Sequence, residues 1–125
     1  MIEGRFGEVD ELIFEIELIA GNGEILPVEV MLDTGFTAGY LAIDEQDINA
    51  LEWQKLQSDI RIKIAQGVGR FDIYAGRVIV DNREFVVPVH VGKDLPEIII
   101  GVKWLKLMRL NADYRRGILT LEYAE

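Results

Sequence analysis

Two apolar segments near the start of the sequence are joined by a short glycine-rich link that can fold them together. From Leu12 to Ile19, apolar side chains mostly alternate with glutamates, which is the two-residue period of a half-buried strand. Residues 21–23 read Gly-Asn-Gly, which accepts positive φ angles and favours a hairpin turn. The segment Ile25–Leu32 has one charge, at Glu29, and supplies the returning strand. The chain therefore begins as an antiparallel hairpin, as sheets and barrels do.

Short strand patterns and turn signals continue to the end of the chain. Pro88 has no backbone N–H to donate, so its strand should lie at an edge or a bulge. The 125 residues fit one domain, residues 1–125, and contain no repeat, linker or low-complexity segment. We expect an all-β, barrel-like fold with one or two short helices. Further strands are predicted at 40–43, 60–64, 71–80, 84–91, 97–101, 111–114 and 118–123, and helices at 45–49 and 102–108.

Composition excludes several kinds of partner and chemistry. The formal net charge of −9 repels phosphates, so we expect no nucleic-acid partner. The absence of cysteine excludes disulfides, a thiol nucleophile and thiolate metal ligands, and it fits a cytoplasmic location. No apolar run reaches the roughly 20 residues of a membrane-spanning helix, and the N-terminus lacks a signal-peptide pattern. We therefore expect no membrane association.

The second arm of the opening hairpin ends in a lone carboxylate, Asp33, followed by Thr34 and Gly35. A strand that leaves a core and turns sharply would hold this carboxylate at a partly buried bend, a position suited to acid–base chemistry. Gly35 permits backbone angles that a side chain would penalise. The same three residue types also form ordinary turns with a hydroxyl cap. The triplet alone therefore leaves both interpretations open.

Two other clusters have simpler structural interpretations. Asp44, Glu45 and Asp47 could suggest a metal site, but no histidine or cysteine is near them. Acids in this spacing are typical of a helix start, so we predict a helix cap there and no metal or cofactor. Gly67 and Gly69 could suggest a nucleotide loop, but no third glycine, Lys-Ser/Thr or helix follows at the required spacing. We predict the tip of a long hairpin, which could act as a mobile lid.

The remaining chemical candidates are isolated side chains. His90 is the only histidine and Ser58 the only serine, and nothing in the pattern brings them together as a catalytic triad. Asp81 and Asp113 are the rival carboxylates within the chain. Both lie in polar, turn-like segments, where solvated or capping roles are predicted.

The order of these parts resembles that of retropepsin-like aspartic peptidases over essentially the whole chain. An opening hairpin leads to Asp33–Gly35, a glycine-tipped hairpin follows at Gly67–Gly69, and a second apolar strand, Ile98–Gly101, ends in glycine. A short helix and a closing strand pair come last. Because the triplet is followed by Phe36, the chain resembles most the prokaryotic members with Asp-Thr-Gly-Phe. The resemblance implies a closed acid-protease barrel that assembles as a homodimer.

The resemblance also implies a mechanism and its residues. One Asp33 from each subunit of a C2 homodimer would face the other, and the pair would activate water to hydrolyse peptide bonds of a polypeptide substrate. Thr34 and Gly35 would support the pair. Substrate contacts are implied for Phe36, Gly67, Val68, Gly69, Ile100 and Gly101. The alternative is a non-catalytic dimeric module that binds extended peptides or mediates assembly through the same groove.

The sequence departs from the family pattern at two places. The residue after the triplet is usually alanine or serine, whereas Phe36 would occupy space beside the substrate. Viral members commonly carry an acid after the triplet and an arginine after the second glycine, where this chain has Thr37 and Val102. This ion pair is therefore missing on both sides, which leaves no charge without its partner.

Overall fold

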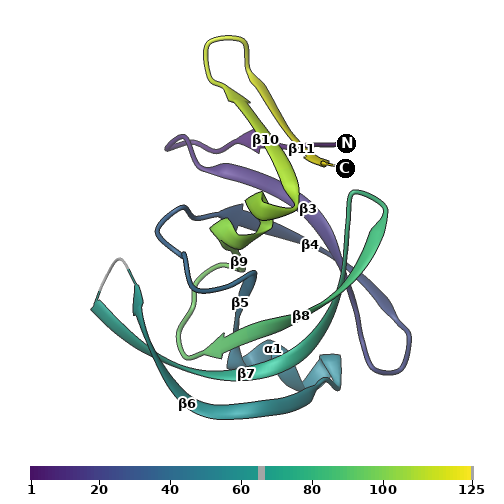
Figure 1. Ribbon diagram of the computed structural model, residues 1–125, viewed down its shortest axis with the longest axis vertical. Coiled ribbons are helices and arrows are strands. Elements are labelled where there is room, and N and C mark those ends of the chain that lie inside the picture. Colours follow the sequence, from purple (N-terminus) through teal and green to yellow (C-terminus); the bar gives the residue numbers. More distant parts are fainter. Residues whose placement is uncertain (65–66, 125) are drawn as a thin grey trace.

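The computed structural model describes residues 1–64 and 67–124 of the chain (Figure 1). The helices are α1 (Glu45–Leu51) and a 3₁₀ helix, η1 (Val102–Lys106). The strands are β1 (Ile2–Glu3), β2 (Arg5–Phe6), β3 (Leu12–Ile19), β4 (Ile25–Leu32), β5 (Leu41–Asp44), β6 (Gln54–Ile64), β7 (Gly67–Val80), β8 (Arg83–Gly92), β9 (Ile99–Ile100), β10 (Met108–Asp113) and β11 (Ile118–Tyr123).

The larger sheet closes on itself. Its strand order is β2-β3-β4-β9-β5-β8-β7-β6, and an additional pairing joins β3 to β7. Strands β3, β4, β9, β5, β8 and β7 thereby form a closed ring, with β2 and β6 attached outside it. The predicted all-β barrel is confirmed, and so are both arms of the opening hairpin, with the predicted bounds.

The core fills the inside of this ring. Alternation along β3 directs Phe14, Ile16 and Leu18 inward, each at most 3% exposed, while Glu15 is exposed. Trp53 also fixes a connection between distant parts of the chain. Its indole Nε1 donates to the carbonyl of Ile19 at 2.8 Å. This bond satisfies a backbone carbonyl that burial would otherwise leave without a partner.

Helix α1 forms as the sequence predicts. Asp44 is its N-cap, and its carboxylate oxygen Oδ2 accepts a hydrogen bond from the backbone N–H of Gln46 at 3.0 Å. Ile48 and Leu51 are the buried residues of this helix. The backbone N–H donors that surround the Asp44 carboxylate lower its pKa. The acids of this segment therefore cap and begin a helix.

Three details of the prediction are corrected. The segment after Gly101 forms a 3₁₀ helix, not the expected helix to residue 108, because only five residues separate the end of Gly101 from the turn into β10. Strand β6 begins at Gln54, six residues before the predicted start. Its register shifts between Lys55 and Gln57 and again before Ile60, and such irregularities break the alternation that a sequence pattern needs.

The third correction concerns the glycine-rich segment. Gly67 and Gly69 belong to strand β7 and pair with Ile64 and Ile62, instead of forming the turn itself. The predicted turn also includes Gln66, which lies outside the described residues. The strand that carries Pro88 is not an edge strand, because β8 lies between β5 and β7. Among the described residues, Pro88 itself has a strand neighbour on one side only, since it lies opposite Ala75 of β7 whereas the β5–β8 pairing starts at Val89.

A second, three-stranded sheet, in the order β1-β11-β10, joins the two ends of the chain. Figure 1 shows the β10–β11 hairpin projecting away from the barrel. The Asp81 carboxylate, in the turn between β7 and β8, accepts a hydrogen bond from the backbone N–H of Tyr123 at 2.8 Å and pairs with the N-terminal ammonium. Both contacts favour its ionised form and lower its pKa. No helix in the described part of the chain is long and apolar enough to cross a membrane.

Candidate active site

Asp33 lies immediately after β4, where two hydrogen bonds fix its backbone. Its N–H donates to the carbonyl of Ile100 in β9, and its own carbonyl accepts from the N–H of Phe36, both at 3.0 Å. The side-chain oxygen Oδ1 accepts from the N–H of Gly35 at 2.8 Å. This arrangement turns the chain sharply and orients the carboxylate, which is partly exposed, while Thr34 and Gly35 are exposed.

The short strand β9 is what brings the two predicted motifs together. It pairs in parallel with β4, with Leu32 opposite Ile100, and antiparallel with β5, with Leu41 opposite the same residue. Ile100 is 1% exposed, so its side chain is part of the core. The site that it supports is therefore built on paired strands in the wall of the barrel.

Gly101 lets the Asp33 loop close tightly over the end of β9. Its N–H donates to the carbonyl of Tyr40, and the next N–H, of Val102, donates to the carbonyl of Phe36, both at 3.0 Å. A Cβ atom on Gly101 would overlap the carbonyl oxygen of Gly39 and lie 2.8 Å from that of Phe36. Only glycine allows backbones to approach this closely.

The tyrosine carbonyl is held a second time from η1. Trp104 is 1% exposed, and its indole Nε1 donates to the carbonyl of Tyr40 at 2.8 Å. The rings of these two residues meet edge to face, with centroids 5.1 Å apart. The helix after Gly101 thus fastens the far end of the Asp33 loop.

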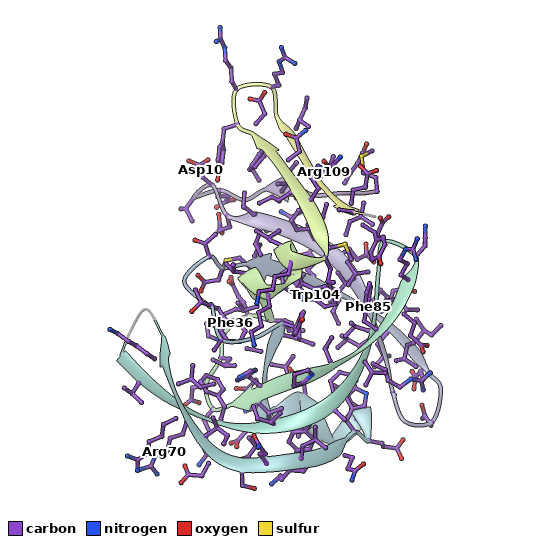
Figure 2. All side chains as sticks on the ribbon, in the orientation of Figure 1. Asp10, Phe36, Arg70, Phe85, Trp104 and Arg109 are labelled. Atoms are coloured by element: carbon purple, nitrogen blue, oxygen red, sulfur yellow. The ribbon has the colours of Figure 1, made fainter. Side chains whose placement is uncertain are left out.

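Phe36 packs mainly into the protein interior. It is 4% exposed, and its ring meets the imidazole of His90 edge to face, with centroids 5.2 Å apart. Figure 2 shows Phe36 and Trp104 in the middle of the molecule. Phe36 anchors the loop that carries Asp33, and its expected contact with substrate stays a prediction.

A pocket of about 390 Å³ opens beside Asp33, Gly35 and Phe36. Its other walls come from β4, β5, β7 and the segment before β9. Most of these residues have no motif that marks them, because residues 92–96 only connect the strands predicted at 84–91 and 97–101. The further lining residues are Met31, Ala42, Phe71, Lys93, Asp94, Leu95, Pro96, Glu97 and Ile99.

The β6–β7 hairpin faces a second, larger pocket. This space of about 590 Å³ is lined by Gly69, Arg70 and Phe71 of β7 and by Lys93 and Leu95, which also line the Asp33 pocket. Figure 2 shows Arg70 on the outer side of the hairpin. Gly67, Val68 and Gly69 do not line the Asp33 pocket, and Val68 is 70% exposed. Their role as a substrate cover therefore stays a prediction.

The rival groups are separated from this site or engaged elsewhere. Asp113 accepts a hydrogen bond from the N–H of Arg116 at 3.2 Å, which is the predicted turn role. Asp81 instead makes long-range contacts that anchor the terminal sheet. Ser58 lines the larger pocket, whereas His90 is 5% exposed inside the barrel. Within residues 1–64 and 67–124, no group of three or more His, Cys, Asp or Glu side chains is arranged to hold a metal ion.

Two solved structures resemble this chain along most of its length. A retropepsin-like aspartic protease from Rickettsia conorii matches with a TM-score of 0.62 and 19% identity, over 98% of this chain and 89% of that one. The EIAV protease, solved with an inhibitor bound, matches with a TM-score of 0.58 and 21% identity, over 75% of this chain and 84% of that one. No protein-family model and no curated protein matches the sequence. The closed barrel, with Asp33 held against β9, is therefore a retropepsin-like fold.

Proposed function

We propose that this chain is an aspartic endopeptidase that works as a C2 homodimer. The observation that carries the proposal is the position of Asp33, a partly exposed carboxylate oriented by the N–H of Gly35 and fixed by β9. The two similar structures are proteases, and peptide hydrolysis is therefore the class of reaction to test. A cytoplasmic location and the absence of a nucleic-acid partner stay predictions.

The chemistry requires two carboxylates in contact. Two like charges cannot both ionise easily at this distance, so the pair shares one proton, as the aspartic proteases illustrate. The ionised carboxylate acts as general base on a water molecule that attacks the peptide carbonyl. The protonated carboxylate donates to the carbonyl oxygen, and a proton then goes to the leaving amine. Each Asp33 supplies one member of the pair.

A second copy of the chain is the source that we propose for the partner carboxylate. Thr34 and Gly35, beside Asp33, are exposed in the single chain and free to meet an identical surface. Asp94 and Glu97 also line the pocket, but they lie on an exposed loop. Within the described part of the chain, neither carboxylate accepts a hydrogen bond, in contrast to Asp33. They are the rivals that an experiment must exclude.

The decisive experiment compares Asp33→Asn with the matched variant Asp94→Asn. Cleavage of an unfolded protein or a peptide library should be abolished by the first change and retained by the second, within about threefold. Full cleavage by Asp33→Asn would refute the assignment, and equal loss in Asp94→Asn would instead indicate a pair within one chain. Both variants should keep the wild-type circular dichroism, because both carboxylates are outside the core.

Sedimentation of the same proteins tests the assembly. The proposal requires a dimer at micromolar concentration, and a strict monomer would contradict it. A dimer that binds peptides without cleaving them would favour the alternative of a non-catalytic peptide-binding or assembly module. A transition-state mimic of the statine type separates the two, because only an enzyme should bind it more tightly than the equivalent peptide.

A further inference from the structure

The only histidine of the chain lies directly beneath the loop that carries Asp33. His90 is 5% exposed, and its Nδ1 atom has no hydrogen-bond partner among the described residues. A buried polar atom without a partner is uncommon and costs stability. The mechanism described above does not use this side chain. Its position therefore calls for an explanation.

Two aromatic rings enclose the imidazole from different parts of the fold. Phe36, one residue after Gly35, meets it edge to face at 5.2 Å between centroids. Phe71, on the β6–β7 hairpin, meets it at 5.8 Å and 77°. Gly39 closes the space, since a Cβ atom there would lie 2.5 Å from Cε1 of the imidazole. His90 thus lies between two points of the Asp33 loop, Phe36 and Gly39, and the base of the hairpin at Phe71.

The surroundings disfavour a charged imidazole. In the strand registers, Ile73 of β7 and Ala42 of β5 lie opposite His90, and neither can titrate. The loop contributes Phe36 and Gly39, which are apolar as well. Burial lowers the pKa of His90, and the positive charge of Lys103, on η1, lowers it further. Lys103 is the one charged group among the described residues that acts on it in this way.

We propose that His90 is a positioning residue that holds the Asp33 loop while its imidazole is neutral and releases the loop when it is protonated. The charged form cannot remain in this apolar enclosure without a partner, so Phe36 and Gly39 must move to admit water. Because the two rings cannot stay packed around a hydrated ion, Asp33 loses its fixed position. The consequence for catalysis rests on the proposed peptidase function, whereas the release of the loop does not.

The sign of the pH effect follows from linkage. A histidine whose pKa is lower in the folded state than in the unfolded state binds fewer protons when folded. The loop is therefore fully held above the ordinary histidine pKa of about 6.5 and is released as the pH falls below it. The active-site loop should loosen on the acid side, independently of the carboxylates.

The test compares the wild type with His90→Leu, which fills a similar volume and cannot titrate. Hydrogen exchange is measured at the amides of Phe36 and Val102, which donate to Asp33 and Phe36. At pH about 7.5, the protection factors of the wild type and of His90→Leu should agree within about twofold. At pH about 5, the protection of the wild type should be lower than that of the variant by at least about fivefold. Equal protection at both values would overturn the proposal. His90→Gln is the second variant, in case the leucine impairs folding.

Lys103→Gln provides a readout that a merely structural role would not change. Loss of the positive charge should raise the pKa of His90 in the held loop and so reduce the loss of protection at pH about 5. The same substitution should have no such effect in the His90→Leu background. An unchanged release in Lys103→Gln would contradict the proposal. If the loop responds as expected but no protein cleaves peptides, the peptidase function fails and the role of His90 stands.

Discussion

Replacing Gly101 by alanine tests how closely the Asp33 loop must pack on β9. The new methyl group would overlap the carbonyl oxygen of Gly39 and lie 2.8 Å from that of Phe36, so the loop must move away from the strand. Forcing an extra methyl group into a packed region costs about 1–3 kcal/mol. The displacement also strains two hydrogen bonds of 3.0 Å, from the N–H groups of Gly101 and Val102, each contributing about 1 kcal/mol net.

The expected loss is therefore about 3–5 kcal/mol, a large share of the stability of an ordinary domain. In urea, with a slope of about 2 kcal/mol per molar, the unfolding midpoint should fall by about 1.5–2.5 M. The fluorescence of Trp104 reports directly on the site, since its indole is bonded to the carbonyl of Tyr40 in the same loop. All titrations must use one protein concentration, because dimer formation would add to the apparent stability.

Gly7→Ala is the matched control, since the atoms nearest to its methyl group would be the carboxylate end of the Glu11 side chain, which can move aside. We expect a loss of less than about 1 kcal/mol there. The reasoning is refuted if Gly101→Ala shifts the midpoint by no more than Gly7→Ala. That result would mean that the loop can relax around a side chain.

Two further substitutions test the support of the pocket-lining Leu95 and the outer part of the β6–β7 hairpin. Asp44→Ala removes the hydrogen bonds from the N–H groups of Gln46 (3.0 Å) and Leu95 (2.9 Å), so thermal melts at pH 7 should show a lower midpoint than the wild type. These bonds lower the pKa of Asp44. The difference in midpoint between variant and wild type should therefore shrink as the pH falls below about 4 and the wild-type carboxylate becomes protonated. Val68→Glu should change stability by less than about 0.5 kcal/mol and reduce peptide cleavage. The control Val86→Glu, at a position of 69% exposure, should change neither stability nor cleavage. Equal cleavage by the two variants would show that the β6–β7 hairpin does not contact the substrate.

The strands that could be predicted are those with regular alternation. Leu12–Ile19 and Ile25–Leu32 have the bounds that the pattern indicates, because one face of each meets the core without interruption. The first half of β6 escaped prediction, since register shifts around Gln57 place consecutive side chains irregularly. The glycines Gly67 and Gly69 were misleading for a related reason, because glycine permits a turn but does not require one.

The candidate site was predictable only in part. Asp33 and Gly101 carry sequence motifs, and the fold brings them to the same point of the barrel through β9. The segment 93–97 has no such motif, and it lines the pocket only because β8 delivers it there. His90 gave a weak signal as the single histidine, but its two aromatic neighbours come from β7 and the Asp33 loop. Contacts of this kind depend on tertiary closure.

Strand β7 is long enough that the outer part of the β6–β7 hairpin extends beyond the closed ring of strands. From Asp72 to Val80 the strand pairs with β8, and Val78 is also opposite a residue of β3. Residues 67–71, in the pairings of the described residues, lie opposite β6 alone. A two-stranded ribbon of this kind resists bending weakly. A bend beside Phe71 would move residues 67–71 without breaking a pair within the closed ring of strands. That bend would lie at Phe71, whose ring packs on His90.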